Sequence, residues 1–467
     1  MKALDPLIDH VAILKDIAIG RRSAVEVLEA ALARIATSDD AVNAFTNVSL
    51  KRAKQDAANI DARRARGEVL PPLAGLPFAV KNLYDIEGEV TLAGSKINKT
   101  NPPATQDAFL VKQLKAAGAV LVGSLNMDEY AYGFTTENTH YGATHNPHQL
   151  SCIAGGSSGG SGAAVAALQV PLTLGTDTNG SIRVPASLCG VWGLKPTFGR
   201  LSRRGVYPFV HNLDHVGPLA SSCELLALSY DALQGPDPLD PGCHALEVQT
   251  VSSSIDRGME GLRVGQLGGY FTDFAGPAAV AALTSAANRL GAVDQVIWPD
   301  AAMGRSAAFI LTASEGGALH LDNLRRQVEN FEPHSVDRFL SGALQPAAWY
   351  IQAQRFRRIY RDKVNELFKH WDVLIAPATP ICAPIIGTDW IEINGQRHPS
   401  RPAMGLLTQP ISFAGCPVVV APCWPSQGQG LPMGVQIIAA PWREDLALRA
   451  AMVLEKAGIA HLQAPAF

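Results

Sequence analysis

Apolar and polar residues near the start of the chain alternate with the period of helices. Ser23 and Glu26 have the spacing of a capping box, and apolar residues then recur at helical intervals as far as Ile35. A charged, alanine-rich stretch over 50–66 predicts a second helix that lies at the surface. We therefore expect residues 1–70 to form an N-terminal helical region.

Beyond this region, short apolar runs alternate with helical stretches. The run 76–81 predicts a buried strand that ends at Lys81, and a predicted helix over 107–117 precedes a strand over 119–122. Such alternation is typical of an α/β fold with a central sheet. The same patterns predict helices over 163–168, 277–290, 335–369 and 444–457, and strands over 171–174, 372–376, 417–422 and 433–438.

The sequence contains no clear domain boundary. It has no internal repeat and no low-complexity linker, and the polar stretch 244–261 indicates a surface connection. We expect a single domain over 1–467, in which the helical region 1–70 precedes a core over 71–220 that carries the chemistry.

The composition excludes several classes of function. The 467 residues are 47% hydrophobic and 17% charged, which is typical of a chain with a large buried core. A net charge of −3 provides no basic surface for nucleic acid. No apolar run reaches the roughly 18 residues of a membrane span, and charged residues interrupt any signal-peptide core. We expect a cytoplasmic protein that binds neither nucleic acid nor membrane.

Cysteine and histidine offer two alternative chemistries. The seven cysteines are odd in number and form no C-x-x-C pair, which argues against a disulfide framework or a zinc site. Cys152 lies close to a glycine-rich stretch, so a catalytic thiol is one alternative. His140, His145 and His148 match no common metal motif, and a histidine-based triad is the other alternative.

Residues 155–186 combine a glycine- and serine-rich loop with a second Gly-Ser turn. A phosphate-binding loop is one interpretation, but the lysine of a P-loop and the G-x-G-x-x-G pattern are both absent. Ser157 and Ser181 lie 24 positions apart, and each follows a glycine, which lets backbone N–H groups converge. Acyl transfer needs such N–H groups beside a nucleophilic hydroxyl. The pattern alone leaves open a catalytic serine site or an ordinary loop.

The same stretch resembles the defining motif of the amidase signature family. The match includes 155–160 (GGSSGG), Asp177 and 181–185 (SIRVP), a composite pattern long enough to be specific. Asn179 departs from it, because the family usually has Gly or Ala there. Asn tolerates left-handed backbone conformations, so we expect the loop to keep its shape. The resemblance implies an α/β fold whose mixed central β-sheet is flanked by helices on both faces.

Three positions match the family's Ser-Ser-Lys triad. By resemblance, Ser181 is the nucleophile, Ser157 the bridging serine and Lys81 the base, and the peptide bond between Gly156 and Ser157 is cis. An ordinary surface lysine is the alternative for Lys81. A lysine that ends an apolar run is expected to be buried, and burial lowers its pKa and makes a neutral amine available as a base.

The family's oxyanion hole falls on the backbone N–H groups of Thr178, Asn179, Gly180 and Ser181. The resemblance implies that Ser181 attacks a carbonyl carbon and forms an acyl-enzyme, which water then releases. Protons return through Ser157 to the leaving nitrogen. This chemistry requires no metal and no organic cofactor.

Two subfamilies are similar to this chain. One comprises the glutamine-hydrolysing A subunits of tRNA-dependent amidotransferases, which segments 126–129 and 136–138 resemble. The other comprises the 1-carboxybiuret hydrolases of cyanuric acid and s-triazine breakdown, and that resemblance covers nearly the whole chain, including 134–142 and 405–410. Asn179 favours the second, because the amidotransferase proteins normally have Gly there. We expect cleavage of a C–N bond of 1-carboxybiuret with release of ammonia.

A carboxylated substrate requires a cation, and both subfamilies work with a partner. Related urea-derivative hydrolases hold a substrate carboxylate with a Tyr and an Arg of the segment that corresponds to 350–358 of this chain. The resemblance therefore points to Tyr350 and Arg358. A solvated basic helix face is the alternative. The resemblance also implies a hetero-oligomer with a small helical partner, similar to the C subunit of the amidotransferase. A non-catalytic scaffold within such a complex is the remaining alternative.

Overall fold

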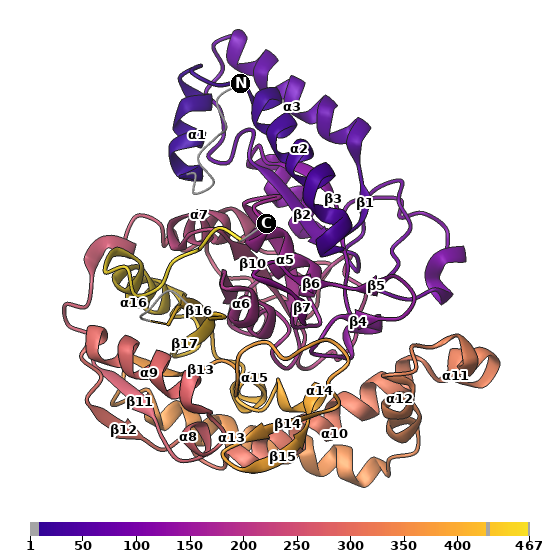
Figure 1. The fold of residues 1–467 in the computed structure, drawn as a ribbon, viewed down its shortest axis with the longest axis vertical. Coiled ribbons are helices and arrows are strands. Elements are labelled where there is room, and N and C mark those ends of the chain that lie inside the picture. Colours follow the sequence, from indigo (N-terminus) through magenta and orange to yellow (C-terminus); the bar gives the residue numbers. More distant parts are fainter. Residues whose placement is uncertain (1–8, 426–429, 466–467) are drawn as a thin grey trace.

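A mixed β-sheet runs through the length of the molecule (Figure 1). The computed structural model describes residues 9–425 and 430–465. Within these residues, 11 strands join in one sheet, in the spatial order β1 (Phe45–Val48), β3 (Val120–Leu125), β2 (Pro77–Lys81), β8 (Leu172–Asp177), β10 (His215–Ala220), β9 (Trp192–Lys195), β16 (Val418–Cys423), β17 (Met433–Ala439), β13 (Val373–Pro377), β11 (Val264–Leu267) and β12 (Asp294–Val296).

Helices and three small two-stranded sheets surround this large sheet. The helices are α1 (His10–Ala18), α2 (Ala24–Val42), α3 (Leu50–Ala65), α4 (Phe109–Ala116), α5 (Gly159–Ala166), α6 (Arg183–Cys189), α7 (Cys223–Leu233), α8 (Tyr270–Asp273), α9 (Pro277–Leu290), α10 (Ala301–Leu319), α11 (Leu321–Gln327), α12 (Val336–Ala343), α13 (Ala347–Leu367), α14 (Ser400–Ala403), α15 (Gln409–Ala414) and α16 (Glu444–Lys456). The small sheets pair β4 (Glu137–Asn138) with β5 (Gly142–Ala143), β6 (His145–Asn146) with β7 (Gln149–Ile153), and β14 (Trp390–Ile393) with β15 (Gln396–Pro399) among the described residues.

Strand directions confirm the predicted mixed sheet and place the chemistry at one edge. β2 is parallel to β3 and β8, whereas β10 is antiparallel to β8 and β9. Because β2 and β8 are parallel neighbours, their C-terminal ends lie at the same edge of the sheet. Lys81 ends β2 and Asp177 ends β8, so the lysine lies beside the loop that leads to Ser181.

Both faces of the sheet are covered, as expected. Side chains of a strand point alternately to opposite faces. Phe78 and Val80 belong to a core cluster that includes apolar residues of α4 and α7. Ala79, between them, belongs to a second cluster with residues of α2, α3 and α5. In Figure 1, α2 and α3 lie beside strands β1 to β3.

Three predicted helical segments differ from the structure. The region 1–70 also contains the edge strand β1, and its residues 1–8 lie outside the described part. The helix predicted over 163–168 is α5, which begins earlier, at Gly159. Close neighbours exclude a larger side chain at this position, because a Cβ on Gly159 would overlap Thr136. The helix predicted over 335–369 is divided into α12 and α13 at Pro346, which has no N–H to continue a helix.

The 19-residue helix α10 was not predicted from the sequence. Its glycines weaken the helical pattern in the sequence, and they also explain how closely α10 packs against α12. Gly317 faces α12, where a Cβ would overlap the backbone of Ala343. Gly342 on α12 faces α10 in turn, where a Cβ would overlap the carbonyl of Ala313. Glycine lowers helix propensity, but here it allows two helices to pack backbone against backbone.

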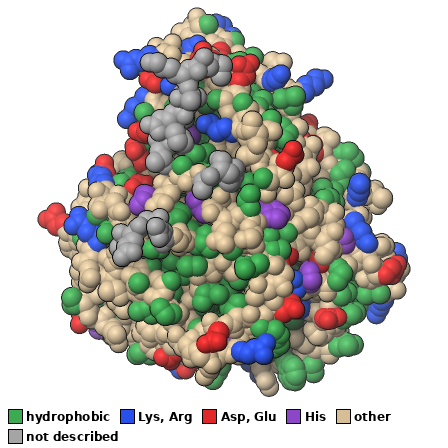
Figure 2. Space-filling view, in the orientation of Figure 1, with side chains coloured by type: hydrophobic (Ala, Val, Ile, Leu, Met, Phe, Trp, Pro, Cys, Tyr) green, Lys and Arg blue, Asp and Glu red, His purple; other side chains and the backbone are tan. Residues whose placement is uncertain are grey.

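The distribution of charged residues on the surface agrees with the small net charge of the sequence. On the face drawn in Figure 2, lysine and arginine side chains are interspersed with acidic ones and form no continuous basic area. None of the helices in the described residues is long and apolar enough to cross a membrane.

Candidate active site

Lys81 lies buried at the end of β2, with its amine directed at two hydroxyls. Its Nζ donates to Ser157 Oγ at 2.7 Å and to Thr176 Oγ1 at 2.9 Å, so the predicted contact between Lys81 and Ser157 is present. Burial lowers the pKa of Lys81 to about 7, although the charge of Asp128 and two further carboxylates opposes the shift. A substantial fraction of the amine is therefore neutral at neutral pH.

The glycine-rich loop presents Ser157 to this amine. The peptide bond between Gly156 and Ser157 is cis, which confirms that prediction. The backbone N–H of Asp128 donates to Ser157 O at 3.3 Å, and Ser158 N donates to Ser181 O at 3.3 Å. The second of these bonds joins the loop of Ser157 directly to the turn of Ser181.

A buried ion pair shapes the turn that carries Ser181. Asp177 Oδ2 accepts hydrogen bonds from Arg183 Nε at 2.9 Å and from the backbone N–H of Ile182 at 3.2 Å. Burial opposes ionisation of Asp177, yet the charge and hydrogen bonds of Arg183 hold its pKa well below the usual range. Asp177 thus stays an anion and accepts hydrogen bonds from Ile182 and Arg183, the two residues that follow Ser181. In the part of the chain described, the N–H groups of residues 179–181 have no protein acceptor.

Thr408, from a distant part of the sequence, closes this turn. Its Oγ1 donates to Asn179 O at 2.6 Å, and its own carbonyl accepts from Arg183 Nη1 at 3.0 Å. Gly180 has a φ of 144°, and a Cβ there would overlap the Thr408 side chain. The turn therefore requires glycine at this position, and its N–H groups remain available for an oxyanion.

A cavity of about 20 Å³ opens in front of Ser181. Its volume is enough for one or two water molecules. The cavity is small and has an apolar wall with a few polar groups. The polar side chains that line it are Thr178, Asn179, Ser181, Thr312, Arg338 and Gln409, and its aromatic side chains are Tyr132, Phe134, Phe209 and Phe309.

Asn179, which lines this cavity, has one side-chain acceptor without a partner in the described residues. Its Nδ2 donates to Thr312 Oγ1 at 2.8 Å, and Thr312 Oγ1 donates to the carbonyl of Ala308 at 2.8 Å. Because the hydroxyl proton of Thr312 is committed to Ala308, its oxygen accepts, and this fixes the orientation of the Asn179 amide. Asn179 Oδ1 is buried and has no partner among the described residues.

Arg338 supplies the positive charge of the cavity. It stacks over the ring of Tyr132 at 5.4 Å, and its Nη1 donates to Tyr132 O at 3.3 Å. Burial lowers its pKa, and it forms no ion pair with a carboxylate in the described chain. No Asp or Glu lines the cavity within the same residues. The site therefore has an unpaired cation and is complementary to an anionic substrate.

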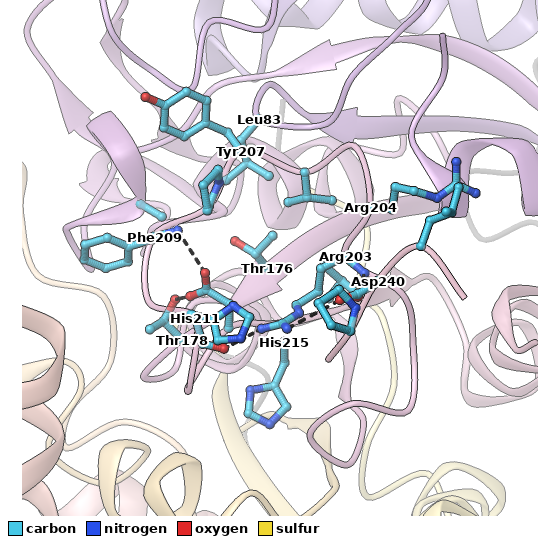
Figure 3. Close-up of a pocket in the computed structure, with 17 residues that line it drawn as sticks. Leu83, Thr176, Thr178, Arg203, Arg204, Tyr207, Phe209, His211, His215 and Asp240 are labelled. Carbon is cyan, nitrogen blue, oxygen red and sulfur yellow. Dashed lines mark hydrogen bonds and ion pairs between the residues drawn. The ribbon is translucent and has the colours of Figure 1, made fainter. Parts of the chain in front are cut away.

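A second cavity, of about 220 Å³, is drawn in Figure 3 and adjoins the first. The two share Ala131, Thr178 and Phe209 as lining residues. Asp214 organises the wall between them, because it accepts from Thr178 Oγ1 at 2.6 Å and from Phe209 N at 2.9 Å. The position of the turn that carries Ser181 is thus tied to the segment that follows Phe209.

The chain matches the Amidase family over residues 26–448. The chain belongs to this family. It is 69% identical over 453 residues to the AtzE subunit of 1-carboxybiuret hydrolase from Pseudomonas sp. (strain ADP), covering 97% of this amidase and 99% of that protein. It is 38% identical over 462 residues to the A subunit of glutamyl-tRNA(Gln) amidotransferase from Anaeromyxobacter dehalogenans (strain 2CP-C), covering 93% of each.

A solved structure is also similar to this amidase over nearly its whole length. That structure is described as an unexpected vestigial protein complex revealing the evolutionary origins of an s-triazine catabolic enzyme. The two superpose with a TM-score of 0.97 at 69% identity, over 98% of this chain and 100% of the other.

The structure does not bring all of the predicted residues to Ser181. Tyr350 donates from its hydroxyl to Glu315 Oε1 at 3.0 Å, and Arg358 lines a separate cavity. Neither lines the cavity of Ser181 within the described chain. Cys152, the alternative nucleophile, is also absent from that lining, and burial raises the pKa of its thiol.

Sequence reasoning missed several residues of this amidase's site. Thr176 shares the amine of Lys81, and Asp128 is a buried carboxylate whose pKa burial raises to about 6. Thr312 and Arg338 lie on α10 and α12, more than 100 positions after Ser181. Only the resemblance of 126–129 to a known segment could have drawn attention to one of them, Asp128.

Proposed function

We propose that this amidase hydrolyses 1-carboxybiuret and releases ammonia, as a step of s-triazine breakdown. The extensive similarity to one chain of a 1-carboxybiuret hydrolase supports the proposal. The observation that carries it is the unpaired Arg338 in the same small cavity as Ser181. A guanidinium binds a carboxylate through two parallel hydrogen bonds. We propose Arg338, in place of Arg358, as the residue that holds the carboxylate.

Asn179 suits the ureido part of such a substrate, which lies beyond its carboxylate. A carboxylated biuret carries N–H donors between its carbonyl groups, and Asn179 Oδ1 is an acceptor without a partner in the described structure. A buried acceptor left unsatisfied costs about 1–3 kcal/mol, which a substrate N–H would recover. The departure from the usual Gly or Ala therefore adds recognition of a ureido group.

The chemistry that we propose begins at Lys81. The neutral amine takes a proton from Ser157, which takes one from Ser181, and Ser181 Oγ attacks the carbonyl carbon. The backbone N–H groups of residues 178–181 then stabilise the oxyanion. The proton returns through Ser157 to the leaving nitrogen, the C–N bond breaks and ammonia departs. Water then attacks the acyl-enzyme, and the carboxylate product and free Ser181 result.

Glutamine hydrolysis is the competing function. A glutamine site must hold a free α-ammonium, and a buried ammonium requires a compensating anion. Within the described residues the cavity of Ser181 has an arginine and no carboxylate. The charge of this cavity therefore favours a substrate that carries an anion and no cation.

Ammonia release by the purified chain tests the function directly. We expect a higher kcat/KM with 1-carboxybiuret than with glutamine, and loss of turnover in Ser181→Ala with an unchanged circular dichroism spectrum. A higher kcat/KM with glutamine would replace our proposal with the amidotransferase function. No turnover of any amide by the chain, alone or in its complex, would favour the scaffold.

Two arginine variants separate the candidate carboxylate ligands. Arg338→Gln should raise KM for 1-carboxybiuret by the equivalent of about 2–5 kcal/mol, the usual effect of losing a desolvated charge pair. Turnover of a neutral amide should change much less. Arg358→Gln should leave both KM values nearly unchanged, because this arginine lines another cavity. The reverse result would restore Arg358 to the predicted role.

We also propose a hetero-oligomer with a small helical partner. The similarity to a structure described as a protein complex supports it. Affinity purification of the tagged chain from its native host should yield a small second protein in a fixed molar ratio. Full activity of a chain that purifies alone from that host would contradict the proposal.

A further inference from the structure

A third cavity, strongly basic, lies on α13, apart from the site described above. It has a volume of about 350 Å³ and is lined by three arginines, Arg357, Arg358 and Arg361, with Asp362 as its one carboxylate in the described chain. Asn212 contributes an amide from the segment that follows Phe209. We call this space the arginine cavity. It shares no lining residue with the cavity of Ser181 in the described structure.

Arg357 is a buried lining residue of the arginine cavity and is held in place by aromatic rings and a hydrogen bond. Its side chain is buried, with the guanidinium stacked 5.5 Å from the ring centre of Phe198 and 5.9 Å from that of Phe413. Its Nε donates to Phe413 O at 3.0 Å. This bond fixes the plane of the guanidinium and leaves both terminal nitrogens free to bind a ligand.

The charge of Arg357 has no partner in the described chain. It makes no ion pair with a carboxylate there. Burial and the nearby charge of Arg361 lower its pKa to about 10, so it remains protonated at neutral pH. A buried, unpaired cation is unfavourable unless an anion compensates it.

The nearby carboxylate, Glu315, is engaged elsewhere. It accepts hydrogen bonds from the Tyr350 hydroxyl at 3.0 Å, from Asn212 Nδ2 at 2.9 Å and from His211 N at 2.6 Å. These neutral donors hold Glu315 in an ordered network of its own. Glu315 and Asp362 offset part of the positive charge, but neither forms an ion pair with the three arginines in the described chain. An excess of positive charge therefore remains, which is what a binding site for an external anion needs.

We propose that the arginine cavity binds a small oxyanion that carries carboxylate or phosphate groups. The rigid fork of Arg357 suits two oxygens of such a group, and the flexible, exposed Arg358 and Arg361 close on it from the same side of the helix. The volume accommodates inorganic phosphate or a small dicarboxylate. Because this cavity is separate from that of Ser181, the bound anion is not the amide undergoing hydrolysis.

Calorimetric titration of the intact chain with inorganic phosphate and with malonate, at constant ionic strength, tests the proposal. We expect saturable binding of at least one of them at one site per chain. Tighter binding of phosphate identifies a phosphate group as the preferred ligand, and tighter binding of malonate identifies a carboxylate. Absence of saturable binding by both would overturn the proposal.

Variants locate the bound anion. The double variant Arg358→Gln/Arg361→Gln changes only exposed side chains and should weaken binding by roughly ten- to a hundred-fold, the usual effect of losing hydrogen bonds from a charged donor. Arg355→Gln, on the same helix but outside the cavity, is the matched control and should bind as the unmodified chain does. Arg338→Gln should also retain binding, because it changes only the substrate cavity. Unchanged binding in the double variant, or equal loss in either control, would refute the site.

Arg357→Gln is the last variant of the series, and its binding is measured provided that the variant folds. This residue supports Phe413 O, so its melting temperature is measured first. A folded variant should lose binding at least as strongly as the double variant. Retention of full affinity in a folded Arg357→Gln would contradict the role of this arginine.

Discussion

At the scale of single residues, burial sets the pKa of Lys81. Nothing in its side chain distinguishes it from the other lysines of the chain. Removal from water disfavours the charged form of the amine. The hydroxyls of Ser157 and Thr176 can form hydrogen bonds with the amine in either of its protonation states. The base of the proposed relay is therefore produced by its surroundings.

The pKa of Lys81 predicts the pH dependence of the reaction. With a pKa lowered to about 7, the amine is protonated below this value and cannot accept the proton of Ser157. We expect kcat/KM to rise with pH through about 7 and then to level off, because kcat/KM reports groups of the free enzyme. Initial rates across the neutral range measure it, and Lys81→Arg should be inactive throughout. A flat profile would exclude Lys81 as the base.

Asn179 predicts a selective effect on ureido substrates. Asn179→Ala removes the Oδ1 acceptor and should lower kcat/KM for 1-carboxybiuret by roughly ten- to a hundred-fold, the equivalent of one buried hydrogen bond. An amide without an internal N–H should be hydrolysed almost as before. Thr312→Ser, which keeps the hydroxyl that orients Asn179, is the matched control and should be nearly silent. Equal losses for both substrates would assign Asn179 to the shape of the turn alone.

At the scale of elements, the contact between α10 and α12 positions one side of the substrate cavity. α10 carries Thr312 and α12 carries Arg338. Their backbones approach closely because Gly317 and Gly342 face each other's helices without side chains. The separation of Thr312 from Arg338 is thus set by two glycines.

Gly342→Ala should disturb both stability and substrate binding. Its Cβ would overlap the carbonyl of Ala313, so the helices must separate, at a cost of about 1–3 kcal/mol that is typical of overpacking. We expect a lower melting temperature together with a raised KM for 1-carboxybiuret. Ser341→Ala, at the adjacent exposed position, should change neither quantity. A variant with normal stability would show that the helices can adjust without strain.

At the scale of the whole molecule, the large sheet joins distant parts of the chain. Its strands come from residues as early as Phe45 and as late as Ala439. β9, from the first half of the chain, pairs directly with β16, from the second half. Separation of the two halves would therefore expose strand edges and break the sheet.

We propose that the chain is a single domain, and the topology predicts how such a chain responds to proteases. Cleavage within the polar stretch 244–261 should not release two stable halves, because each would lose a sheet neighbour. Limited proteolysis followed by size-exclusion chromatography should show nicked fragments that remain together and dissociate only on denaturation. Two separately folded fragments would establish two domains.

The sequence by itself determined the family and the mixed α/β sheet, and it pointed to Lys81, Ser157 and Ser181 as the triad that we propose, because these depend on local patterns and on a long contiguous motif. Buried strand β2 could be predicted for the same reason, since it carries its own apolar run. For β8 the pattern predicted only 171–174, because the strand continues through polar residues to Asp177. Helix α10 could not be predicted, because its glycines are explained only by the partner helix that they contact.

Only the tertiary structure decided which groups surround the reactive serine. It places Arg338, and not Arg358, beside Ser181, and it orients Asn179 through Thr312. Thr312 and Arg338 come from helices far from the motif, and no sequence spacing records how two helices pack. The charge and size of the substrate cavity, and hence the choice among amides, are properties of that packing.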